Sequence, residues 1–237
     1  MNIIECNQGT PEWLKCRAGI PTASELSVLV TSKGNISEGQ GVRSFLMRKL
    51  AERWLGRPLE SFHAFGAVDQ GKVLEDEAIP FFEMERGIAV ERVGFITTDD
   101  GKAGCSPDGL MRETKRGLEL KCPEPQTHLS YLLAGELPDD YLGQVQGSLL
   151  VTGYEAWFFM SYCRHFPALI LEVKPDLAYM ATLAQALERF NEALDSAYLR
   201  LAEMNGGEPN REAFVDTDTV ATMAGVSEDA LEEFYDE

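Results

Sequence analysis

Residue types that commonly build metal or disulfide sites are scarce in this sequence. Its 237 residues include only five cysteines, at positions 6, 16, 105, 122 and 163, and three histidines, at positions 63, 128 and 165. No two cysteines form a C-x-x-C pair, and the histidines are isolated from one another. The pattern argues against a zinc site, an iron–sulfur cluster or a disulfide framework. It favours reduced thiols, and we therefore expect a cytoplasmic protein.

Long apolar runs are also missing. No stretch approaches the roughly 20 apolar residues that a membrane-spanning helix needs, and the N-terminus lacks the pattern of a signal peptide. We therefore expect no membrane association. Hydrophobic residues still make up 44% of the chain, which is enough for a large core in one domain followed by a tail.

Positive charge is in short supply. The chain has 21 Lys and Arg residues against 39 Asp and Glu residues, and its formal net charge is −18. Eleven acidic residues and one arginine from Glu203 to the end account for −10, and the first 202 residues carry the remaining −8. At face value this balance argues against a nucleic-acid partner. Any contact with DNA must come from a local patch or channel, with metal ions offsetting clustered carboxylates.

Helical and strand patterns alternate along the chain without any internal repeat. Helix-start signals and helical spacing predict helices over 10–18, 22–30, 42–55, 67–84, 126–134, 138–151 and 176–204. Short apolar and aromatic runs predict strands over 88–98, 103–111, 117–122, 155–163 and 168–173. The order predicts an α/β fold with a mixed sheet of about five strands flanked by helices.

The stretch 105–123 carries the strongest chemical signal. Glu119 and Lys121 are two residues apart on a short predicted strand, so their side chains share a face. A polar turn lets the segment with Asp108 fold back beside this strand, and two carboxylates and one ammonium then converge. Oxygen ligands suit Mg²⁺ or Mn²⁺, and the lysine can orient a water or stabilise an oxyanion. The alternative is an ordinary sheet whose charges face water.

Two polar residues on predicted helices lie in suggestive places. Glu75 follows Leu74 at the edge of the apolar stripe of its helix, and Gln144 lies one turn after Tyr141 on the same helix face. Each has an ordinary alternative. Glu75 can be a solvated helix charge, and Gln144 can be a buried amide that bonds to the backbone.

Several segments in fixed order combine into one pattern. They are W-L-K-C-R-A-G at 13–19 with T-A-S at 22–24, G-x-x-x-E-x-x-A at 71–78, C-S-P-D-G-L at 105–110, G-L-E-L-K-C-P at 117–123, and Q-V-Q at 144–146. This pattern resembles the YqaJ-like viral recombinase family, to which the exonuclease of bacteriophage lambda belongs. The resemblance runs from about residue 8 to residue 204. It implies a restriction-endonuclease-like PD-(D/E)xK core and 5′→3′ exonuclease activity on double-stranded DNA.

The resemblance also implies roles for the residues of the strand pair. Asp108 and Glu119 would bind Mg²⁺, for which Mn²⁺ can substitute, with help from the backbone carbonyl of Leu120. Lys121 would position and activate the attacking water. These roles agree with the chemistry that the residue types favour on their own.

Five further residues receive roles from the resemblance. Glu75 and Gln144 would complete the shell around the metal and the water. Arg17, Ser24 and Ser106 match the positions that form a pocket for a terminal 5′-phosphate. A guanidinium can bind phosphate through two hydrogen bonds, and two hydroxyls can donate without adding bulk.

The sequence departs from the family pattern in two places. The family member compared has an additional aspartate upstream of the Pro-Asp motif, and that position falls near Thr98, with Asp99 and Asp100 displaced by a residue or two. Whether Asp99 or Asp100 contributes to the site is left open. A basic residue after the lysine strand is also missing, and residues 126–128 occupy that region. We therefore expect the protein to bind the end of a DNA strand more weakly, or through other residues, than the family member compared.

These patterns predict an exonuclease domain over 1–204 and an acidic tail over 205–237, which is either a small docking helix or partly disordered. The resemblance implies a ring-shaped homotrimer, double-stranded DNA ends as substrate and a single-strand annealing protein as partner, in the cytoplasm of a bacterial host. The alternatives are a structure-specific endonuclease on the same fold and a DNA-end-binding module without catalysis.

Overall fold

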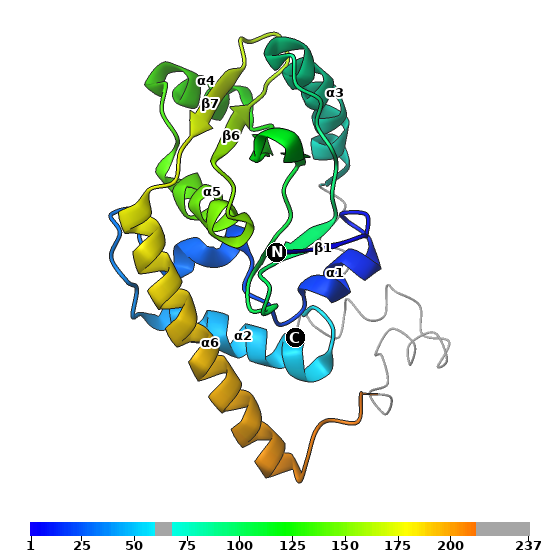
Figure 1. Cartoon of the computed structure of the whole chain (residues 1–237), viewed down its shortest axis with the longest axis vertical. Helices are drawn as coiled ribbons and strands as arrows, with labels where there is room; N and C mark the ends of the chain where they lie inside the picture. The colour runs from blue at the N-terminus through cyan, green and yellow to red at the C-terminus, as the bar shows by residue number, and fades with distance from the viewer. Residues whose placement is uncertain (60–67, 212–237) are drawn as a thin grey trace, which may run out of the picture. The chain divides into compact units, whose positions relative to one another are not determined.

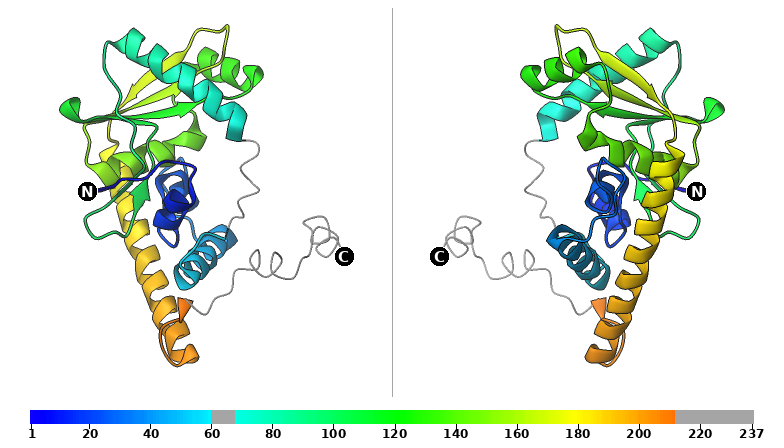
Figure 2. Two further views of the ribbon diagram at one scale, coloured as in Figure 1. Left: turned by 90° about the vertical axis from the view of Figure 1, so that its right-hand side faces the viewer. Right: turned by 90° about the vertical axis from the view of Figure 1, so that its left-hand side faces the viewer.

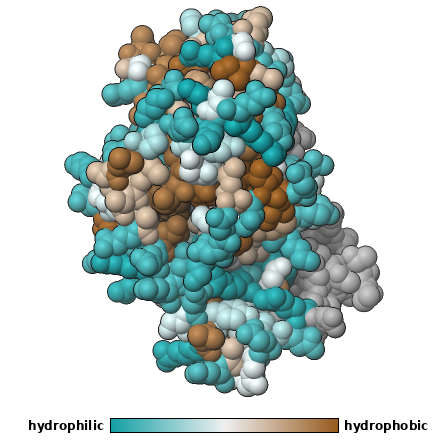
Figure 3. All heavy atoms as spheres, in the orientation of Figure 1, coloured by the Kyte–Doolittle hydropathy of each residue, from teal (hydrophilic) through white to brown (hydrophobic). Residues whose placement is uncertain are grey.

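The computed structural model of the chain describes residues 1–59 and 68–211, and only the backbone of residues 68–73. The chain divides into two units, Met1–Tyr198 and Leu199–Glu237. Every site discussed below lies in the first unit. Within the described ranges, no helix is both long and apolar enough to cross a membrane. Hydrophilic residues cover most of the face in Figure 3, with patches of apolar residues between them.

The described residues form seven strands, six α-helices and two 3-10 helices (Figure 1). The strands are β1 (Asn2–Ile4), β2 (Phe95–Thr97), β3 (Gly104–Cys105), β4 (Gly109–Met111), β5 (Arg116–Lys121), β6 (Ala156–Ser161) and β7 (Leu169–Val173). The α-helices are α1 (Pro11–Arg17), α2 (Gln40–Leu55), α3 (Val68–Arg86), α4 (Pro125–Ala134), α5 (Asp139–Thr152) and α6 (Leu177–Asn205). The 3-10 helices are η1 (Ala23–Val28) and η3 (Arg112–Thr114).

The larger sheet has the strand order β4–β5–β6–β7, in which only β5 and β6 run parallel. Strand β6 is buried at every residue, and its sequence is almost entirely apolar, as expected for a strand covered on both faces. On one face Leu118 and Leu120 pack with Phe158 in a cluster beneath α3. On the other face Trp157 and Phe159 belong to the main core, to which α5 and α6 also contribute. Figure 2 shows α3 and α5 on opposite sides of this sheet.

The smaller sheet is antiparallel, with the order β1–β2–β3. Its last strand, β3, leads into β4 of the larger sheet through residues 106–108. Pro107 has no N–H group and fixes its own φ angle, so a continuous ladder cannot run through this segment. The single strand predicted over 103–111 is therefore two short strands in different sheets. Asp108 lies at the point where the chain passes from one sheet to the other.

The α/β class, with a mixed sheet flanked by helices, is confirmed, and the strand division differs from the prediction. The sheet predicted with about five strands is a sheet of four strands and a sheet of three. Of the segment predicted as a strand over 88–98, only β2 forms a regular strand. Before β2, Glu91 makes an isolated bridge with Leu110, and the chain at Gly94 lies so close to the Cys6 carbonyl that a side chain would not fit. The helix predicted over 22–30 is the 3-10 helix η1.

Glycines allow α5 to approach η1 closely. A Cβ at Gly143 would lie 3.0 Å from the Ser27 backbone, and one at Gly147 would lie 2.9 Å from Leu26 Cδ1. Helix α5 also packs against β2, β3 and β6. This close packing holds Gln144, next to Gly143, against the larger sheet.

The start of β5 is equally tight. A Cβ at Gly117 would lie 2.3 to 2.5 Å from three ring carbons of the buried Trp157. We expect Gly117→Ala to lower the free energy of unfolding by about 1–3 kcal/mol, because the ring cannot move without repacking the core. Chemical denaturation would measure the change.

Gly41→Ala is the matched control for this prediction. It lies in α2, where the nearest atom to an added Cβ is 3.9 Å away and alanine is a better helix former than glycine. Its stability should be unchanged or slightly raised. Equal stabilities of the two variants would contradict the packing argument.

Candidate active site

Three hydrogen bonds, each involving a backbone group, hold Asp108 and the preceding residue just before β4. Its own N–H donates to the Leu118 carbonyl at 3.0 Å, and its Oδ2 accepts the Leu120 N–H at 2.6 Å. The preceding carbonyl, of Pro107, accepts a 2.8 Å hydrogen bond from Gln8 Nε2. The carboxylate therefore lies against the edge of β5 that faces β4. Backbone N–H and C=O groups of one strand residue point to the same edge, so the Leu120 carbonyl lies on that edge too.

Glu119 and Lys121 share the opposite face of β5 from Leu118 and Leu120, as the two-residue spacing predicts. Lys121 Nζ lies 2.6 Å from Glu119 Oε1, and Gln144 Nε2 donates to the same oxygen at 2.6 Å. The Glu119 side chain is only 3% exposed, whereas Lys121 is 28% exposed. The ammonium thus reaches the surface of a site whose carboxylate is enclosed.

The carboxylates of this site resist ionisation. Burial raises the pKa of Asp108 well above its usual value, and the nearby Glu119 charge adds to the effect, while Lys121 and the Leu120 N–H oppose it. Burial likewise raises the pKa of Glu119, although Lys121 and Gln144 favour its charged form. Burial acts to lower the pKa of Lys121, but the charges of Glu119 and Asp108 outweigh it and raise that pKa. The lysine therefore stays charged beside two carboxylates that repel each other.

Glu75 reaches the same region from α3. It is half-buried, and desolvation raises its pKa despite the charges of Arg92 and Lys121. Glu75 and Asp108 line one cavity of about 290 Å³, to which Gln8 and Arg92 also contribute. Glu75 is therefore not a fully solvated helix charge, since its carboxylate shares an enclosed space with Asp108.

Gln144 makes its bond to a side chain and not to the backbone. The backbone-binding amide of this helix is the neighbouring Gln146, which is buried, donates to the Lys174 carbonyl and accepts the Asp176 N–H. Gln146 fastens α5 to the chain that leads into α6. Gln144, two residues earlier, is left to hold Glu119.

The donor set fits a hard divalent cation. In the part of the chain that the structure describes, no three His, Cys, Asp or Glu side chains are grouped as a metal site. The contacts above occupy one oxygen of each carboxylate, Asp108 Oδ2 and Glu119 Oε1. The other two oxygens and the Leu120 carbonyl are the hard ligands that Mg²⁺ or Mn²⁺ prefers. A cation there would also relieve the repulsion from Glu119 that adds to the raised pKa of Asp108.

Arg17 and Ser106, 89 positions apart in the sequence, are linked through Trp13. The Trp13 indole N–H donates to Ser106 Oγ at 2.9 Å, and the Arg17 guanidinium carbon lies 4.1 Å from the centre of the Trp13 ring system. Arg17 also donates to Thr22 Oγ1 at 3.3 Å, and Thr22 contacts Ser24. The structure thus connects all three residues predicted for a phosphate pocket.

Three residues hold the site together in ways that the sequence patterns did not predict, since those patterns indicated only helix-start positions for Trp13 and Thr22 and no role for Gln8. Trp13 and Thr22 connect the predicted phosphate pocket, and Gln8 fastens the segment before Asp108. Trp13 and Thr22 lie inside the segments that carry the family pattern, which was the available signal. Tyr141 was noted only for its position, and its ring centre lies 5.3 Å from Lys121 Nζ. A lysine next to an aromatic face gains a modest cation–π attraction.

The residues at the two departures from the family pattern have local roles. Asp99 pairs with the N-terminal amine, and Asp100 accepts hydrogen bonds from the Thr98 hydroxyl and the Lys102 N–H in the β2–β3 turn. His128 is fully buried, where it contacts Ser161 Oγ at 2.8 Å and the Pro167 carbonyl at 3.0 Å. It joins α4 to β6 and to the chain before β7.

The sequence is similar to one known protein family. The sequence model of the YqaJ-like viral recombinase domain matches residues 12–155, a range that runs from before Arg17 to beyond Gln144. No curated protein matches the sequence.

Solved structures resemble the fold. Crystal structures of the alkaline exonuclease LHK-Exo from Laribacter hongkongensis, one of them in complex with dAMP, superpose with a TM-score of 0.73 at 25% identity. The match covers 83% of this chain and 98% of that one. A phage-related exonuclease from Haemophilus somnus 129PT has a TM-score of 0.57 at 13% identity, over 77% of this chain and 96% of that one. At that identity the likeness shows the fold alone.

The raised pKa of Asp108 generates a stability prediction for the metal-free protein. A carboxyl whose pKa is raised on folding contributes its full stability below its unfolded pKa and loses it as the pH rises through the folded value. Asp108→Asn removes the charge and keeps an oxygen for the Leu120 N–H. In chelator near pH 7.5, the variant should therefore unfold with a free energy roughly 1 kcal/mol or more above wild type.

The pH dependence separates this effect from ordinary repacking. The advantage of Asp108→Asn should shrink towards zero near pH 4, where the wild-type carboxyl is protonated as well. Asp139→Asn, at an exposed position in the first turn of α5, should give no gain at either pH. A loss of stability in Asp108→Asn at pH 7.5 would contradict the electrostatic account.

Proposed function

The chain belongs to the YqaJ-like viral recombinase domain family, and from that premise we propose that it is a Mg²⁺-dependent exonuclease that degrades linear double-stranded DNA in the 5′→3′ direction. Such an enzyme resects duplex ends for recombination of the kind found in bacteriophages. The observation that carries the proposal is the meeting of Asp108, Glu119 and Lys121 beside the edge of β5. The exonucleases with the same fold support it.

The residues divide the chemistry among them. Asp108, Glu119 and the Leu120 carbonyl would hold the metal ion, which would polarise the phosphodiester and favour ionisation of a water. Lys121 keeps its positive charge at the surface of the site, where it can orient the water and stabilise charge that develops on the phosphate oxygens. Gln144 holds Glu119 in place, and Glu75, which lines the same cavity as Asp108, would provide a further carboxylate near the attacking water.

A pocket for the terminal 5′-phosphate favours an exonuclease over an endonuclease. We assign this pocket to Arg17, Ser24 and Ser106, which Trp13 and Thr22 connect. Ser106 precedes Asp108 by two residues, so an end held by Ser106 lies close to the metal ligands. An endonuclease has no terminal phosphate to bind.

Further features of the proposal rest on the family. We propose that residues 1–204 form the catalytic domain and that the acidic segment 205–237 contacts a neighbouring subunit or a partner. The assembly would be a homotrimer that encircles DNA and hands its single-stranded product to an annealing protein. The five cysteines are free thiols, which suits the reducing cytoplasm of a bacterial host.

Digestion of linear and circular duplexes with and without Mg²⁺ tests the activity. Wild type should release nucleotides from linear duplex only, and with strands labelled at one end, loss should begin at the 5′ terminus. Lys121→Ala should lower turnover by roughly 10²–10³ with little change in the Mg²⁺ requirement, as expected for a lost electrostatic contact. Lys174→Ala, which removes an exposed lysine at the end of β7, should behave like wild type.

Each alternative has its own result in this assay. Cutting of circular duplex would identify an endonuclease, and binding of ends without release of nucleotides would identify a non-catalytic module. Full activity of a folded Lys121→Ala variant would refute the assignment of the active site.

End recognition generates a second prediction. Wild type should degrade duplexes with 5′-phosphate ends faster than duplexes with 5′-hydroxyl ends, by about tenfold or more, because a charge-assisted contact contributes roughly 1.5–3 kcal/mol. Arg17→Ala should slow digestion of phosphorylated ends and remove most of the preference. The measurement is the ratio of initial rates on the two substrates.

Lys15→Ala is the control for the charge of Arg17. Both residues lie in the last turn of α1, where a cation also favours the end of the helix dipole. Lys15→Ala should keep the preference for phosphate, since Lys15 is exposed and outside the pocket. If both variants lowered both rates equally, Arg17 would serve the helix and not the substrate.

A further inference from the structure

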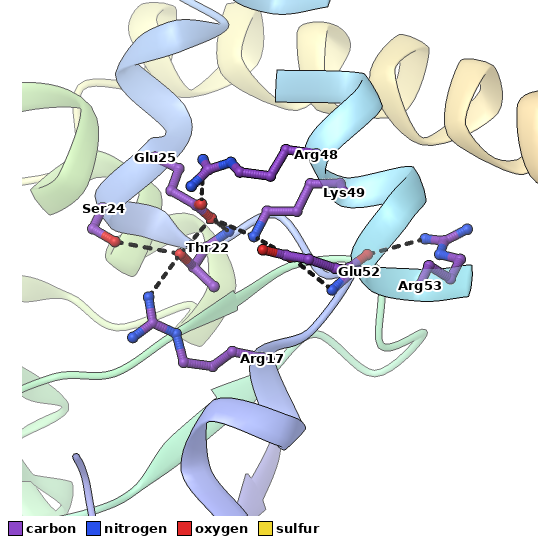
Figure 4. A network of polar contacts seen from close by, with 9 residues as sticks. Arg17, Thr22, Ser24, Glu25, Arg48, Lys49, Glu52 and Arg53 are labelled. Carbon is purple, nitrogen blue, oxygen red and sulfur yellow. Dashed lines mark hydrogen bonds and ion pairs between the residues drawn. The ribbon is translucent and has the colours of Figure 1, made fainter. Parts of the chain in front are cut away.

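The hydroxyl group of Thr22 lies between Arg17, Ser24 and Glu25 (Figure 4). Thr22 is 2% exposed and immediately precedes η1. Its Oγ1 lies 3.3 Å from Arg17 Nη2, 3.3 Å from Ser24 Oγ and 2.7 Å from Glu25 Oε2. Two of these three neighbours are the residues assigned above to the 5′-phosphate. The third neighbour, Glu25, is an acid, and it determines which way the Thr22 hydroxyl proton points.

The donors and acceptors around Thr22 can be assigned from their chemistry. An ionised carboxylate only accepts hydrogen bonds and a guanidinium only donates them. The Thr22 proton is therefore directed at Glu25, and its oxygen accepts from Arg17. Since that proton is committed, Ser24 must be the donor in its contact with Thr22. Glu25 thus turns the lone pairs of Thr22 towards the two pocket residues.

Glu25 is kept ionised by cations from α2. Arg48 Nη2 lies 2.7 Å from Glu25 Oε1, and Lys49 Nζ lies 3.0 Å from Glu25 Oε2. Burial acts to raise the pKa of Glu25, but Lys49 and the hydrogen bonds from Thr22 outweigh it and lower that pKa. Glu25 therefore stays ionised, and the positive charges of Arg48 and Lys49 balance its negative charge, so it does not repel a phosphate bound nearby.

The same network fastens the turn between Arg17 and Thr22 to α2. Glu52 lies 3.1 Å from Lys49 Nζ and accepts the Gly19 N–H at 3.0 Å. Gly19 has φ +73°, and a Cβ there would lie 2.7 Å from Arg53 Cβ. The turn therefore rests directly on α2 and has little freedom to move.

Thr22 is also joined to the segment that carries the metal ligands. It forms a parallel bridge with Gly104, whose N–H donates to the Pro21 carbonyl at 3.0 Å. Ser106 follows Gly104 by two residues. The backbone thus holds Thr22 at a fixed distance from Ser106. Ser106 itself belongs to the segment that continues from β3 to Asp108.

From these contacts we propose that Thr22 is a positioning residue for the 5′-phosphate of the DNA end. Its hydroxyl, oriented by Glu25, holds the Arg17 guanidinium against the Trp13 ring before the substrate arrives. A side chain that is ordered in advance loses less conformational freedom on binding, so affinity for the phosphate rises. The inference rests on the proposed function, since it assigns a role within the pocket proposed there.

The test compares Thr22→Val with Thr22→Ser. Valine keeps the shape and loses the hydroxyl, whereas serine keeps the hydroxyl. Two quantities are measured for each variant: the ratio of initial rates on 5′-phosphate and 5′-hydroxyl duplexes, and binding of the same duplexes in chelator by fluorescence anisotropy. Thr22→Val should lower the preference for 5′-phosphate ends by about tenfold in both measurements, because the variant loses one contact with a charged partner. Thr22→Ser should retain most of it.

Thr182→Val is the matched control, because the Thr182 hydroxyl bonds only within α6, to the Ala178 carbonyl. It should keep the wild-type preference. A folded Thr22→Val variant with the wild-type preference would overturn the role of Thr22, while loss of the preference in Arg17→Ala would leave the pocket standing. Loss of the preference in Thr22→Ser would also overturn it, even if Thr22→Val did not fold. Equal wild-type rates on both ends would overturn the pocket and the inference together.

Discussion

The site depends on keeping two carboxylates close together in a space that burial makes unfavourable for their charges. Burial raises the pKa of both Asp108 and Glu119, and each also carries a hydrogen bond that favours its ionised form. The Leu120 N–H supports the first and Gln144 the second, while Lys121 supplies the nearest positive charge. The arrangement therefore stores electrostatic strain that a divalent cation would release. The packing of the fold therefore holds these carboxylates in the positions that we propose for metal binding.

The chain achieves this closeness by changing sheets at a proline. The segment of residues 106–108 leaves β3, where the backbone is bridged to Thr22, and enters β4, where it is paired with β5. One short connection therefore joins the proposed phosphate pocket to the proposed metal ligands. An enzyme that removes nucleotides from an end must hold that end at a fixed distance from the bond it cleaves. The three-residue connection provides a rigid spacing of this kind.

Much of the candidate site could be predicted because its signals are local. The alternation in β5 places Glu119 and Lys121 on one face whatever surrounds them, and the turn before β5 returns the chain beside Asp108. The division into two sheets could not be predicted, since it depends on which distant strands pair on either side of Pro107. Thr22 is predictable as a helix cap, and it forms a capping box with Glu25 at the start of η1. Its contact with Arg17 could not be predicted, because Arg17 belongs to another helix.

The acidic balance of the chain is compatible with a DNA substrate because its cations are used selectively. On α2, Arg48 and Lys49 balance Glu25, and Arg53 pairs with Asp195, so these charges serve the fold. Arg17 contacts the Trp13 ring and the Thr22 hydroxyl, and the proposed pocket places it where the substrate would present its terminal phosphate. At the bond to be cleaved, the proposed metal ion would supply the positive charge.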